Sequence, residues 1–519
     1  MPTPATVTDT IAAISTPPGR GGIGIVRLSG PQAASIAAQL VRLRHPLDNL
    51  AQLEHAHARL ADVLDAADDD ATRIDEALVT FFPAPRSYTA EDLVEIATHG
   101  SPVVLELLLR RALDLGARLA EPGEFTQRAF LSGRLDLTQA EAVRDLIDAQ
   151  TLTQARQAAS QMGGALSHRV APVKQALVDL VALLEAGIDF AEDDIDVTPQ
   201  QEIARQIAEL TPPLTALEAS FARGRIVHDG LTLAIVGRPN AGKSSLFNRL
   251  VERDRAIVTA TPGTTRDLVT ERISIGGIPI ELVDTAGLRD GAPQSPNGPV
   301  APLLDEVEQL GIARSREALA DAALVLIVLD ATQPLNDEEH RLLAAVVGRP
   351  ALVAVNKSDL VNTDIGTSDL SNGVLKSMNE IPRDSTKCQG TTSVVPQLRQ
   401  IKEGALAPEG DLASLSLPAL PTSALTGEGI SALREKILAL ATGGAAAEPG
   451  LLTNLRQHQA VTTALAALAD AATANAASIP HEMILLDLYR ALWALDSLTG
   501  QTTPDDILNL IFSTFCIGK

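Results

Sequence analysis

The spacing of hydrophobic residues changes along the chain, and each change predicts a different kind of structure. Between Thr10 and about Leu28, two apolar runs flank the glycine-rich segment TPPGRGG, which predicts a strand, a turn and a strand. The stretches EALVTFFPAP and EDLVEIATHG alternate as strands do, whereas VVLELLLRRALDLG has helical spacing. We therefore expect an α+β domain over residues 1–130.

Helical spacing dominates from about Leu135 to Gly224, where apolar residues recur every three or four positions. Long helices with few turn signals predict a bundle. After the linker ATGGAAAEPG the same spacing returns in LLTNLRQHQAVTTALAALADAA. We expect the two helical stretches, residues 131–228 and 445–519, to form one discontinuous bundle.

Strands and helices alternate between these two stretches, in residues 229–444. The runs LTLAIVG, ELVDTAG, ALVLIVLD and ALVAVNK are continuously apolar and end in polar residues, as strands of a covered parallel sheet do. The sequence thus predicts an inserted α/β domain whose parallel sheet has helices on both faces. Two segments without a clear pattern, residues 290–303 and 361–416, are expected to be loops.

Composition narrows the class of protein. Of the 519 residues, 45 % are hydrophobic, which is enough for several cores. No apolar run reaches the roughly 18 residues of a membrane helix, and MPTPATVTDTIAAIS has no Lys or Arg to begin a leader. Two cysteines, Cys388 and Cys516, are too few for a disulfide framework. We expect a soluble, cytoplasmic, multidomain protein.

The balance of charge limits the ways in which the chain can bind nucleic acid. Lys+Arg 42 and Asp+Glu 65 leave a net charge of −23. Phosphate binding needs clustered cations, so a broad nucleic-acid surface is not expected. With 9 Phe, 2 Tyr and 1 Trp, a platform for stacking bases is not expected either. Any RNA contact should be local or made through a partner.

The segment GRPNAGKS, from Gly237 to Ser244, fits the phosphate-binding pattern G-x-x-x-x-G-K-[ST]. It follows an apolar strand and opens a predicted helix, which is the context that this motif requires. Main-chain N–H groups and the helix N-terminus would then bind phosphates. Lys243 would neutralise β- and γ-phosphate oxygens, and the Ser244 hydroxyl would ligate Mg²⁺.

Two further motifs concern the metal and the γ-phosphate. The segment DTAG ends a strand, so that Asp284 can hold Mg²⁺ through water and the Gly287 N–H can meet the γ-phosphate. Thr265, in the segment TTRD between the phosphate loop and Asp284, is the expected second Mg²⁺ ligand. These motifs stand in the order that GTP-hydrolysing domains require.

The segment NKSD, at the end of the strand ALVAV, is expected to determine which nucleotide base is bound. A carboxylate at Asp359 can accept hydrogen bonds from both guanine N1–H and the exocyclic amine, a pair that adenine lacks. After a later short strand, Ser423 to Leu425 can present a backbone N–H to guanine O6. The residues expected to contact GTP are Asn240, Ala241, Gly242, Lys243, Ser244, Ser245, Thr259, Ala260, Thr261, Pro262, Gly263, Thr264, Thr265, Asp284, Thr285, Ala286, Gly287, Asn356, Lys357, Ser358, Asp359, Ser423, Ala424 and Leu425.

One residue is missing from this set. Many small GTPases place a glutamine directly after the DxxG glycine to orient the attacking water, but Leu288 stands there. We expect Asn240, inside the phosphate loop, to hold a monovalent cation against the phosphates instead. The pattern Gly19-x-Gly21-x-x-Gly24 formally matches a dinucleotide fingerprint, and we reject it because a strand follows it, not a helix.

Together the motifs resemble a translation-factor-class GTPase domain. The blocks TPPGRGGIGIVRLSG and EPGEFTQRAFLSGRLDLTQAEAV, with the terminal FCIGK, extend the resemblance to the MnmE (TrmE) family of tRNA uridine-34 modification GTPases. The resemblance covers residues from about 9 to 519, apart from the two expected loops. It implies that the N-terminal domain binds a tetrahydrofolate derivative, 5,10-methylene- or 5-formyl-tetrahydrofolate, and forms a homodimer.

The resemblance also implies site residues. By position, the folate site comprises Arg27, Glu95, Arg134 and Lys519, although the family pattern has Lys at the position of Arg134. In the family, K⁺ is held by residues that match Asn240, Thr259, Thr261 and Thr264. A glutamate acting through water as general base matches Glu308, in the segment DEVE, so Glu308, Lys243 and Asn240 are the expected catalytic residues.

The partners implied are tRNA and the FAD-dependent MnmG (GidA) protein, in a heterotetramer or larger assembly. With that partner, the family adds an aminomethyl or carboxymethylaminomethyl group to C5 of the wobble uridine. Cys516 is open to two interpretations, as a catalytic thiol or as a structural residue. The alternative function is a GTP-dependent assembly switch of the Era/Der type, yet neither a KH-like loop in basic surroundings nor a basic tail is present.

Overall fold

The computed structural model describes residues 9–45, 50, 53–65, 72–189, 199–254, 269–284, 322–361, 417–443, 450–500 and 511–518. Two compact units make up the chain. The first comprises residues 1–149, 155–221 and 448–519, and the second comprises residues 150–154 and 222–447. Across the described ranges, no helix has both the length and the apolar character that crossing a membrane requires.

The first unit begins with a seven-stranded sheet in the order β3-β4-β5-β6-β2-β1-β7. Its neighbours are antiparallel except β1 and β7, which are parallel. The elements are β1 (Ile11–Ile14), β2 (Gly21–Ser29), α1 (Ala33–Leu40), β3 (Val41–Leu43), β4 (Ala58–Leu64), β5 (Arg73–Phe82), β6 (Leu93–Gly100), α2 (Pro102–Asp114) and β7 (Arg118–Leu119). As predicted, the glycine-rich segment leads into a strand, β2, and not into a helix.

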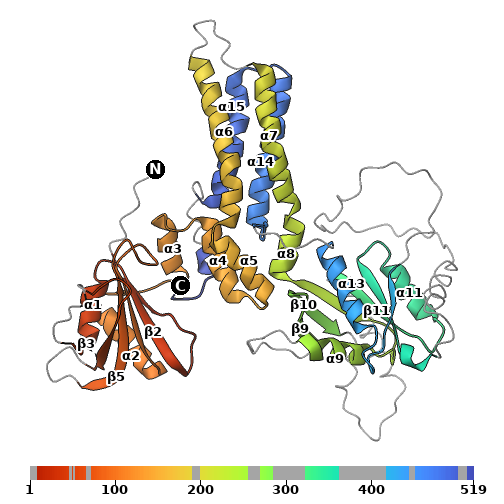
Figure 1. The fold of residues 1–519 in the computed structure, drawn as a ribbon, viewed down its shortest axis with the longest axis horizontal. Coiled ribbons are helices and arrows are strands. Elements are labelled where there is room, and N and C mark those ends of the chain that lie inside the picture. The colour runs from red at the N-terminus through yellow and green to blue at the C-terminus, as the bar shows by residue number, and fades with distance from the viewer. Residues whose placement is uncertain are drawn as a thin grey trace, which may run out of the picture. The chain divides into compact units, whose positions relative to one another are not determined.

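Helices α1 and α2 cover one face of this sheet (Figure 1). The covered face contributes Val26, Leu28 and Ile96 to a core that Leu105 and Leu108 of α2 complete. Residues that alternate with these on β2 and β6 lie on the opposite face. This arrangement confirms the predicted α+β domain.

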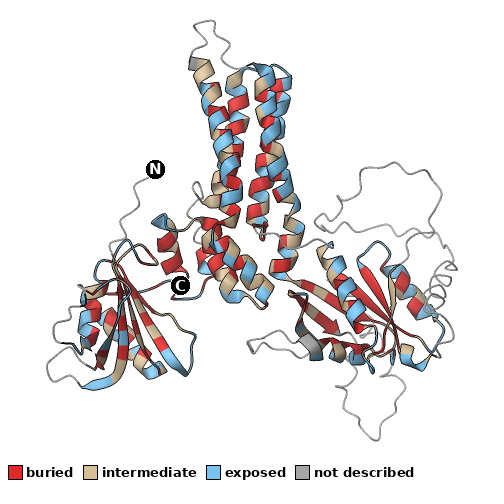
Figure 2. Cartoon of the chain, in the orientation of Figure 1, coloured by how far each residue is buried: buried red, intermediate tan, exposed pale blue. Residues whose placement is uncertain are grey.

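A helical bundle forms the rest of the first unit. Its elements are α3 (Glu124–Leu131), α4 (Leu137–Asp148), α5 (Leu152–Met162), α6 (Ala165–Asp189), α7 (Gln200–Ala219), α14 (Leu455–Ala476) and α15 (His481–Thr499). Leu177 and Leu210, which precede residue 222, share one core with Val461 and Leu488, which follow residue 447. Figure 2 shows the buried residues on the inward faces of α6, α7, α14 and α15. The predicted discontinuous bundle is therefore confirmed.

The second unit contains a six-stranded sheet in the order β13-β12-β11-β8-β10-β9. Buried residues of α9 and α13 pack on one face, and Leu343 of α11 packs on the other. The prediction of helices on both faces is thereby confirmed. The elements are α8 (Phe221–Asp229), β8 (Leu231–Val236), α9 (Lys243–Asp254), β9 (Val269–Ile275), β10 (Ile278–Asp284), β11 (Leu324–Asp330), α11 (Asp337–Ala345), β12 (Ala351–Asn356), the 3-10 turn η3 (Ser358–Leu360), β13 (Ala419–Pro421) and α13 (Ile430–Thr442).

The sheet differs from the expectation in one strand. Five strands are parallel, but β9 pairs antiparallel with β10, so the sheet is mixed. Gly276 and Gly277 join the two strands with φ of 59° and 85°, a two-residue hairpin that glycine makes possible. The expected loops at 290–303 and 361–416 lie outside the described residues, apart from Val361. The finer domain boundaries, 1–130, 131–228, 229–444 and 445–519, stay a prediction.

Candidate functional site

The phosphate-binding motif forms the connection between β8 and α9. Gly242, just before the helix, has φ of 93°, and a Cβ there would lie 2.2 Å from Asn356 Nδ2. Glycine is therefore required both by the backbone and by the close approach of the next loop. Asn240 has φ of 62° and is exposed, and Ser244 and Ser245 are exposed in the first turn of α9. The loop thus leaves a helix N-terminus open to an anion.

Lys243 lies at the start of α9 and is buried. Its Nζ donates to the main-chain carbonyls of Gly237, at 2.8 Å, and Arg238, at 2.9 Å. The ammonium thus lies within the loop whose glycines and N–H groups would receive phosphate. A bound phosphate would compete with these carbonyls for the same donor.

Asn356, at the end of β12, connects the phosphate loop to the loop after β13. Its Nδ2 donates to Ala241 O, and its Oδ1 accepts from the Ala424 N–H, both at 3.0 Å. With 2 % of its surface exposed, Asn356 is nearly buried, so both hydrogen bonds are protected from water. Three segments far apart in sequence therefore meet at one end of the parallel strands.

Lys357 continues this loop in a left-handed conformation, with φ of 64°. Its Nζ donates to Asp330 Oδ2 at 2.7 Å, at the end of the neighbouring strand β11. Burial raises the pKa of Asp330, but hydrogen bonds from Lys357 and Thr332 outweigh that effect and lower it to about 2. Asp330 is accordingly a charged partner for Lys357 over the whole physiological range.

Asp359 is exposed in η3, two residues after Lys357. The Ser358 N–H donates to Thr422 O at 3.1 Å, which ties this turn to the segment before Ser423. Ser423 is buried, and Leu425, two residues on, is 82 % exposed. The structure thus brings Asn356, Lys357, Ser423 and Ala424 next to the phosphate loop.

Several expected nucleotide-site residues, with Lys519 of the expected folate site, lie wholly or partly outside the described part of the chain. Of Asp284 only the backbone, at the end of β10, is described. The expected site residues outside the described part are Thr259, Ala260, Thr261, Pro262, Gly263, Thr264, Thr265, Thr285, Ala286, Gly287, Glu308 and Lys519.

The residues expected to bind folate gather in the first unit, on the sheet face opposite α1 and α2. Arg27 of β2 and Glu95 of β6 are direct cross-strand partners. Arg27 Nε and Nη2 both donate to Glu95 Oε1, at 3.0 and 2.6 Å. Since both bonds end on Oε1, the other carboxylate oxygen is left for a ligand donor, as far as the described residues show.

Tyr88 joins the third expected residue to this pair. The guanidinium carbon of Arg134 lies 5.2 Å from the Tyr88 ring centroid and that of Arg27 lies 5.9 Å away, within the range of cation–π contacts. Arg134 also donates to Tyr88 O at 2.7 Å. Burial raises the pKa of the Tyr88 hydroxyl, which shares a hydrogen bond of 2.9 Å with Thr126. Arg27, Glu95 and Arg134 are therefore brought together.

The described C-terminal segment, residues 511–518, reaches the Arg27–Glu95 pair. Gly518 O accepts from Arg27 Nη1 at 3.3 Å and from Ser15 Oγ at 3.1 Å. Gly518 has φ of 93°, and a Cβ there would lie 2.7 Å from Ile14 O, so only glycine allows this approach. Phe512 and Phe515 are buried against α4, whereas Cys516 is exposed. Gly518 is thus anchored next to the Arg27–Glu95 pair.

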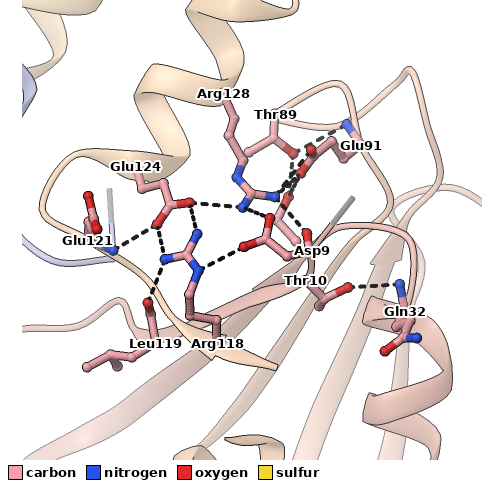
Figure 3. Close-up of polar contacts among 11 residues, drawn as sticks. Asp9, Thr10, Gln32, Thr89, Glu91, Arg118, Leu119, Glu121, Glu124 and Arg128 are labelled. Carbon is pink, nitrogen blue, oxygen red and sulfur yellow. Dashed lines mark hydrogen bonds and ion pairs between the residues drawn. The ribbon is translucent and has the colours of Figure 1, made fainter. Parts of the chain in front are cut away.

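A partly buried ionic network holds α3 against the sheet (Figure 3). Arg128, 3 % exposed, pairs with Asp9 at 2.9 Å, Glu91 at 3.1 Å and Glu124 at 2.9 Å. Glu124 also pairs with Arg118 at 2.6 Å; burial raises the pKa of its carboxyl, but these donors lower it overall. The same helix carries Thr126, so the network fixes a contact of Tyr88.

The sequence did not point to every residue of these sites. Asp330 ends an apolar strand, as Asn356 does, and this shared position in the sequence could have indicated that Asp330 lies near the nucleotide site. Tyr88 and Phe125, the latter with its ring centroid 5.6 Å from the guanidinium carbon of Arg27, had no such signal. Their role depends on long-range packing.

Comparison with known proteins decides the family. Family models described as the MnmE helical domain and the GTP-binding protein TrmE N-terminus match residues 137–516 and 10–134. The tRNA modification GTPase MnmE of Koribacter versatilis (strain Ellin345) is 52 % identical over 513 residues, which cover 98 % of this chain and 99 % of that protein. The chain belongs to the MnmE family. The predicted membership is thereby confirmed, as is the predicted enzyme class, a GTPase.

Other relatives agree. The tRNA modification GTPase MnmE of Roseiflexus castenholzii (strain DSM 13941 / HLO8) is 39 % identical over 512 residues, 98 % of this chain and 99 % of that protein. A crystal structure of Aquifex aeolicus Era bound to GDP.AlF4- is 22 % identical over 46 % of this chain and 66 % of that one. The TM-score between the two structures is 0.27.

Proposed function

We propose that this member of the MnmE family hydrolyses GTP and modifies tRNA. Together with an FAD-dependent partner of the MnmG (GidA) type, it adds an aminomethyl or carboxymethylaminomethyl group to C5 of the wobble uridine. A tetrahydrofolate derivative supplies the one-carbon unit. The observation that carries the proposal is the full-length identity of 52 % to a tRNA modification GTPase, in a chain that also has the phosphate loop bridged by Asn356.

The second unit fits a magnesium nucleotide. A phosphate group would meet the N-terminus of α9 and the Lys243 ammonium, both of which favour negative charge. Ser244, exposed in the first turn, would ligate Mg²⁺, which prefers oxygen ligands. Thr265 is the proposed second ligand, and Asp284 is proposed to hold the metal through water. Asp359 and the Ala424 segment would receive guanine.

The exposed amide of Asn240 is the part of the proposed K⁺ site that lies among the described residues. Thr259, Thr261 and Thr264 would complete that site. K⁺ would supply positive charge next to the phosphates, the role that an arginine finger has elsewhere. Glu308 is the proposed general base, acting through water.

The first unit fits a reduced folate. A pterin has an amide edge whose N–H can donate to Oε2 of Glu95, which takes no hydrogen bond from any described residue. The anionic glutamyl tail of a folate suits Arg134 and Lys519. Arg134 replaces the Lys of the family pattern, so charge is retained while the fork of the guanidinium differs in geometry. The folate derivative would supply the one-carbon unit, and these residues would bind and orient it.

The homodimer has support from the sheet face that carries Arg27 and Glu95. Leu60, Leu78, Ala97 and Ile25 are successive cross-strand partners on this face, so they form a continuous apolar row over four strands. Leu60 is 43 % and Leu78 50 % exposed. An apolar row of this kind on a sheet is typical of a protein interface. We propose that a second copy covers it.

Purified protein tests the proposal in two assays. It should hydrolyse GTP in the presence of Mg²⁺, and it should retain a reduced folate through gel filtration. An inability to hydrolyse GTP would contradict the nucleotide part. Retention of no reduced folate, with hydrolysis intact, would instead favour an assembly switch of the Era/Der type.

A further inference from the structure

We propose that Asp330 is a positioning residue for guanine recognition, which fixes the Lys357 side chain and links it to the phosphate loop through Arg238. The proposal rests on the GTP binding proposed above. It concerns a residue outside every motif by which the nucleotide site was found.

Both carboxylate oxygens of Asp330 have partners. Oδ1 accepts from the Thr332 N–H at 2.9 Å and from Thr332 Oγ1 at 2.6 Å. Oδ2 accepts from Lys357 Nζ at 2.7 Å. Asp330 is 5 % exposed and the Lys357 side chain is 32 % exposed, so the carboxylate is shielded from water and the pair is more strongly coupled than one between two exposed groups. The two bonds from Thr332 fix the orientation of the carboxylate and hence the position of the lysine.

Arg238 approaches the same oxygen from the phosphate loop. Its Nη2 lies 3.8 Å from Asp330 Oδ2, and its Nε lies 3.3 Å from Glu339 Oε1 in α11. Glu339 is 1 % exposed and closes the capping box of α11 with Asn336. The four charges, Lys357, Asp330, Arg238 and Glu339, thus form a chain from the NKSD loop (residues 356–359) through the phosphate loop to α11.

The position of Lys357 controls the residues that follow it. Its left-handed backbone turns the chain from the end of β12 into η3, which carries Asp359. Asp359 is exposed, and its side chain has no hydrogen bond or ion pair to any described residue. What holds the carboxylate that would select guanine is therefore the turn itself, with its anchors at Asn356, at Ser358 N–H and at Lys357 Nζ.

Loss of the Asp330 charge should consequently weaken binding of the guanine base more than binding of the phosphates. A freed Lys357 loosens the turn, and Asp359 then holds the exocyclic amine of guanine less well. IDP has the same phosphates and ribose as GDP but lacks that amine. The ratio of GDP to IDP affinity therefore reports the placement of Asp359, which a general loss of stability does not change.

The experiment measures GDP and IDP dissociation constants for the full chain and for Asp330→Asn by titration calorimetry, below the melting temperature of both. We expect GDP affinity to fall about tenfold, the effect of one hydrogen bond to a charged group. The GDP-to-IDP ratio should fall at least about threefold. Asp330→Asn in a Lys357→Met background should change the ratio no further. An unchanged ratio in Asp330→Asn would overturn the proposal.

Two further variants keep the test decisive. Glu338→Gln removes an equal charge from the exposed neighbour of Glu339 and should leave both affinities unchanged. If Asp330→Asn does not fold, Asp330→Glu replaces it in the test. This variant keeps the charge but displaces the carboxylate, so it too should lower the ratio of GDP to IDP affinity. An unchanged ratio in Asp330→Glu would contradict the proposal. Wild-type protein that binds neither nucleotide would refute the proposed GTP binding itself, a different outcome.

Discussion

Asn240 is the residue on which the proposed cation dependence rests. It adopts a left-handed backbone that few residues other than glycine and asparagine tolerate, and its amide is exposed in the phosphate loop. Leu288 cannot orient water as glutamine does, so a cation next to the phosphates is the proposed substitute. We expect Asn240→Ala to abolish the excess of GTP hydrolysis in K⁺ over that in Na⁺, measured as phosphate release at matched ionic strength.

A second variant separates the amide from the backbone. Asn240→Gly removes the amide and keeps the left-handed conformation accessible. It should lose K⁺ stimulation as fully as Asn240→Ala and keep GDP affinity closer to the wild-type value. Equal hydrolysis by wild-type protein in the two salts, or K⁺ stimulation that survives in the glycine variant, would contradict the role of Asn240.

At this scale the sequence predicted residue types better than contacts. Asn356 and Lys357 were expected from the NKSD motif; Asn356 ends β12, and Lys357 follows it directly. Their partners Ala241 and Asp330 could not be read from the motif, because they depend on β8, β11 and β12 being neighbours in the sheet. Tyr88 was missed for the same reason, since its two arginine neighbours lie 61 and 46 residues away in sequence.

The phosphate loop and the NKSD loop (residues 356–359) are in direct contact, through the hydrogen bond from Asn356 to Ala241. A Cβ on Gly242 would lie 2.2 Å from Asn356 Nδ2, so the Asn356 amide would have to move out of its present position. Gly242→Ala should therefore break the Asn356–Ala241 hydrogen bond and reduce GDP affinity more than about tenfold. Titration calorimetry measures this loss directly.

Gly443, after α13, is a matched control for that prediction. It also has a positive φ, 65°, but a Cβ there would meet nothing within 4 Å. Gly443→Ala should cost about 1 kcal/mol of stability from backbone strain and leave GDP affinity intact. If both variants lose affinity alike, backbone strain explains the loss and the contact between the loops does not.

Among the elements, those with strong periodicity were predicted well. The helices of the bundle and the buried strands β8, β10, β11 and β12 follow from their spacing. Strand β9 was missed, although the Gly276-Gly277 pair before β10 was a hairpin signal in the sequence. Its antiparallel pairing makes the sheet mixed, a feature that the apolar runs alone could not reveal.

The proposed dimer is a property of the whole molecule. Leu78 lies at the middle of the apolar row, between Leu60 and Ala97. A charge there would be buried without a partner in the interface, which is strongly unfavourable. We expect Leu78→Asp to be monomeric in light scattering at concentrations where the wild type is dimeric.

Val103→Asp provides the comparison. Val103 is 77 % exposed and lies on α2, away from the apolar row, at a helix N-terminus that accepts negative charge. It should leave the dimer intact. A Leu78→Asp protein that folds and stays dimeric would place the interface elsewhere.

At the scale of the molecule, the sequence predicted the separation of two chemistries. One unit has the nucleotide loops, and the other has the Arg27–Glu95 pair with the C-terminal Gly518 beside it. The net charge of −23 predicts that the proposed binding of tRNA is local or made through the proposed partner. We propose that GTP hydrolysis in the second unit serves the modification chemistry in the first.

Mass spectrometry of the wobble uridine tests this coupling of the two units. tRNA is taken from a deletion strain complemented with the wild-type gene, with Gly242→Ala or with Gly443→Ala. We predict that the deletion removes the C5 modification, and that the wild type and Gly443→Ala restore it while Gly242→Ala does not. Unaltered modification in the deletion strain, or full restoration by a Gly242→Ala protein shown not to bind GDP, would contradict the account.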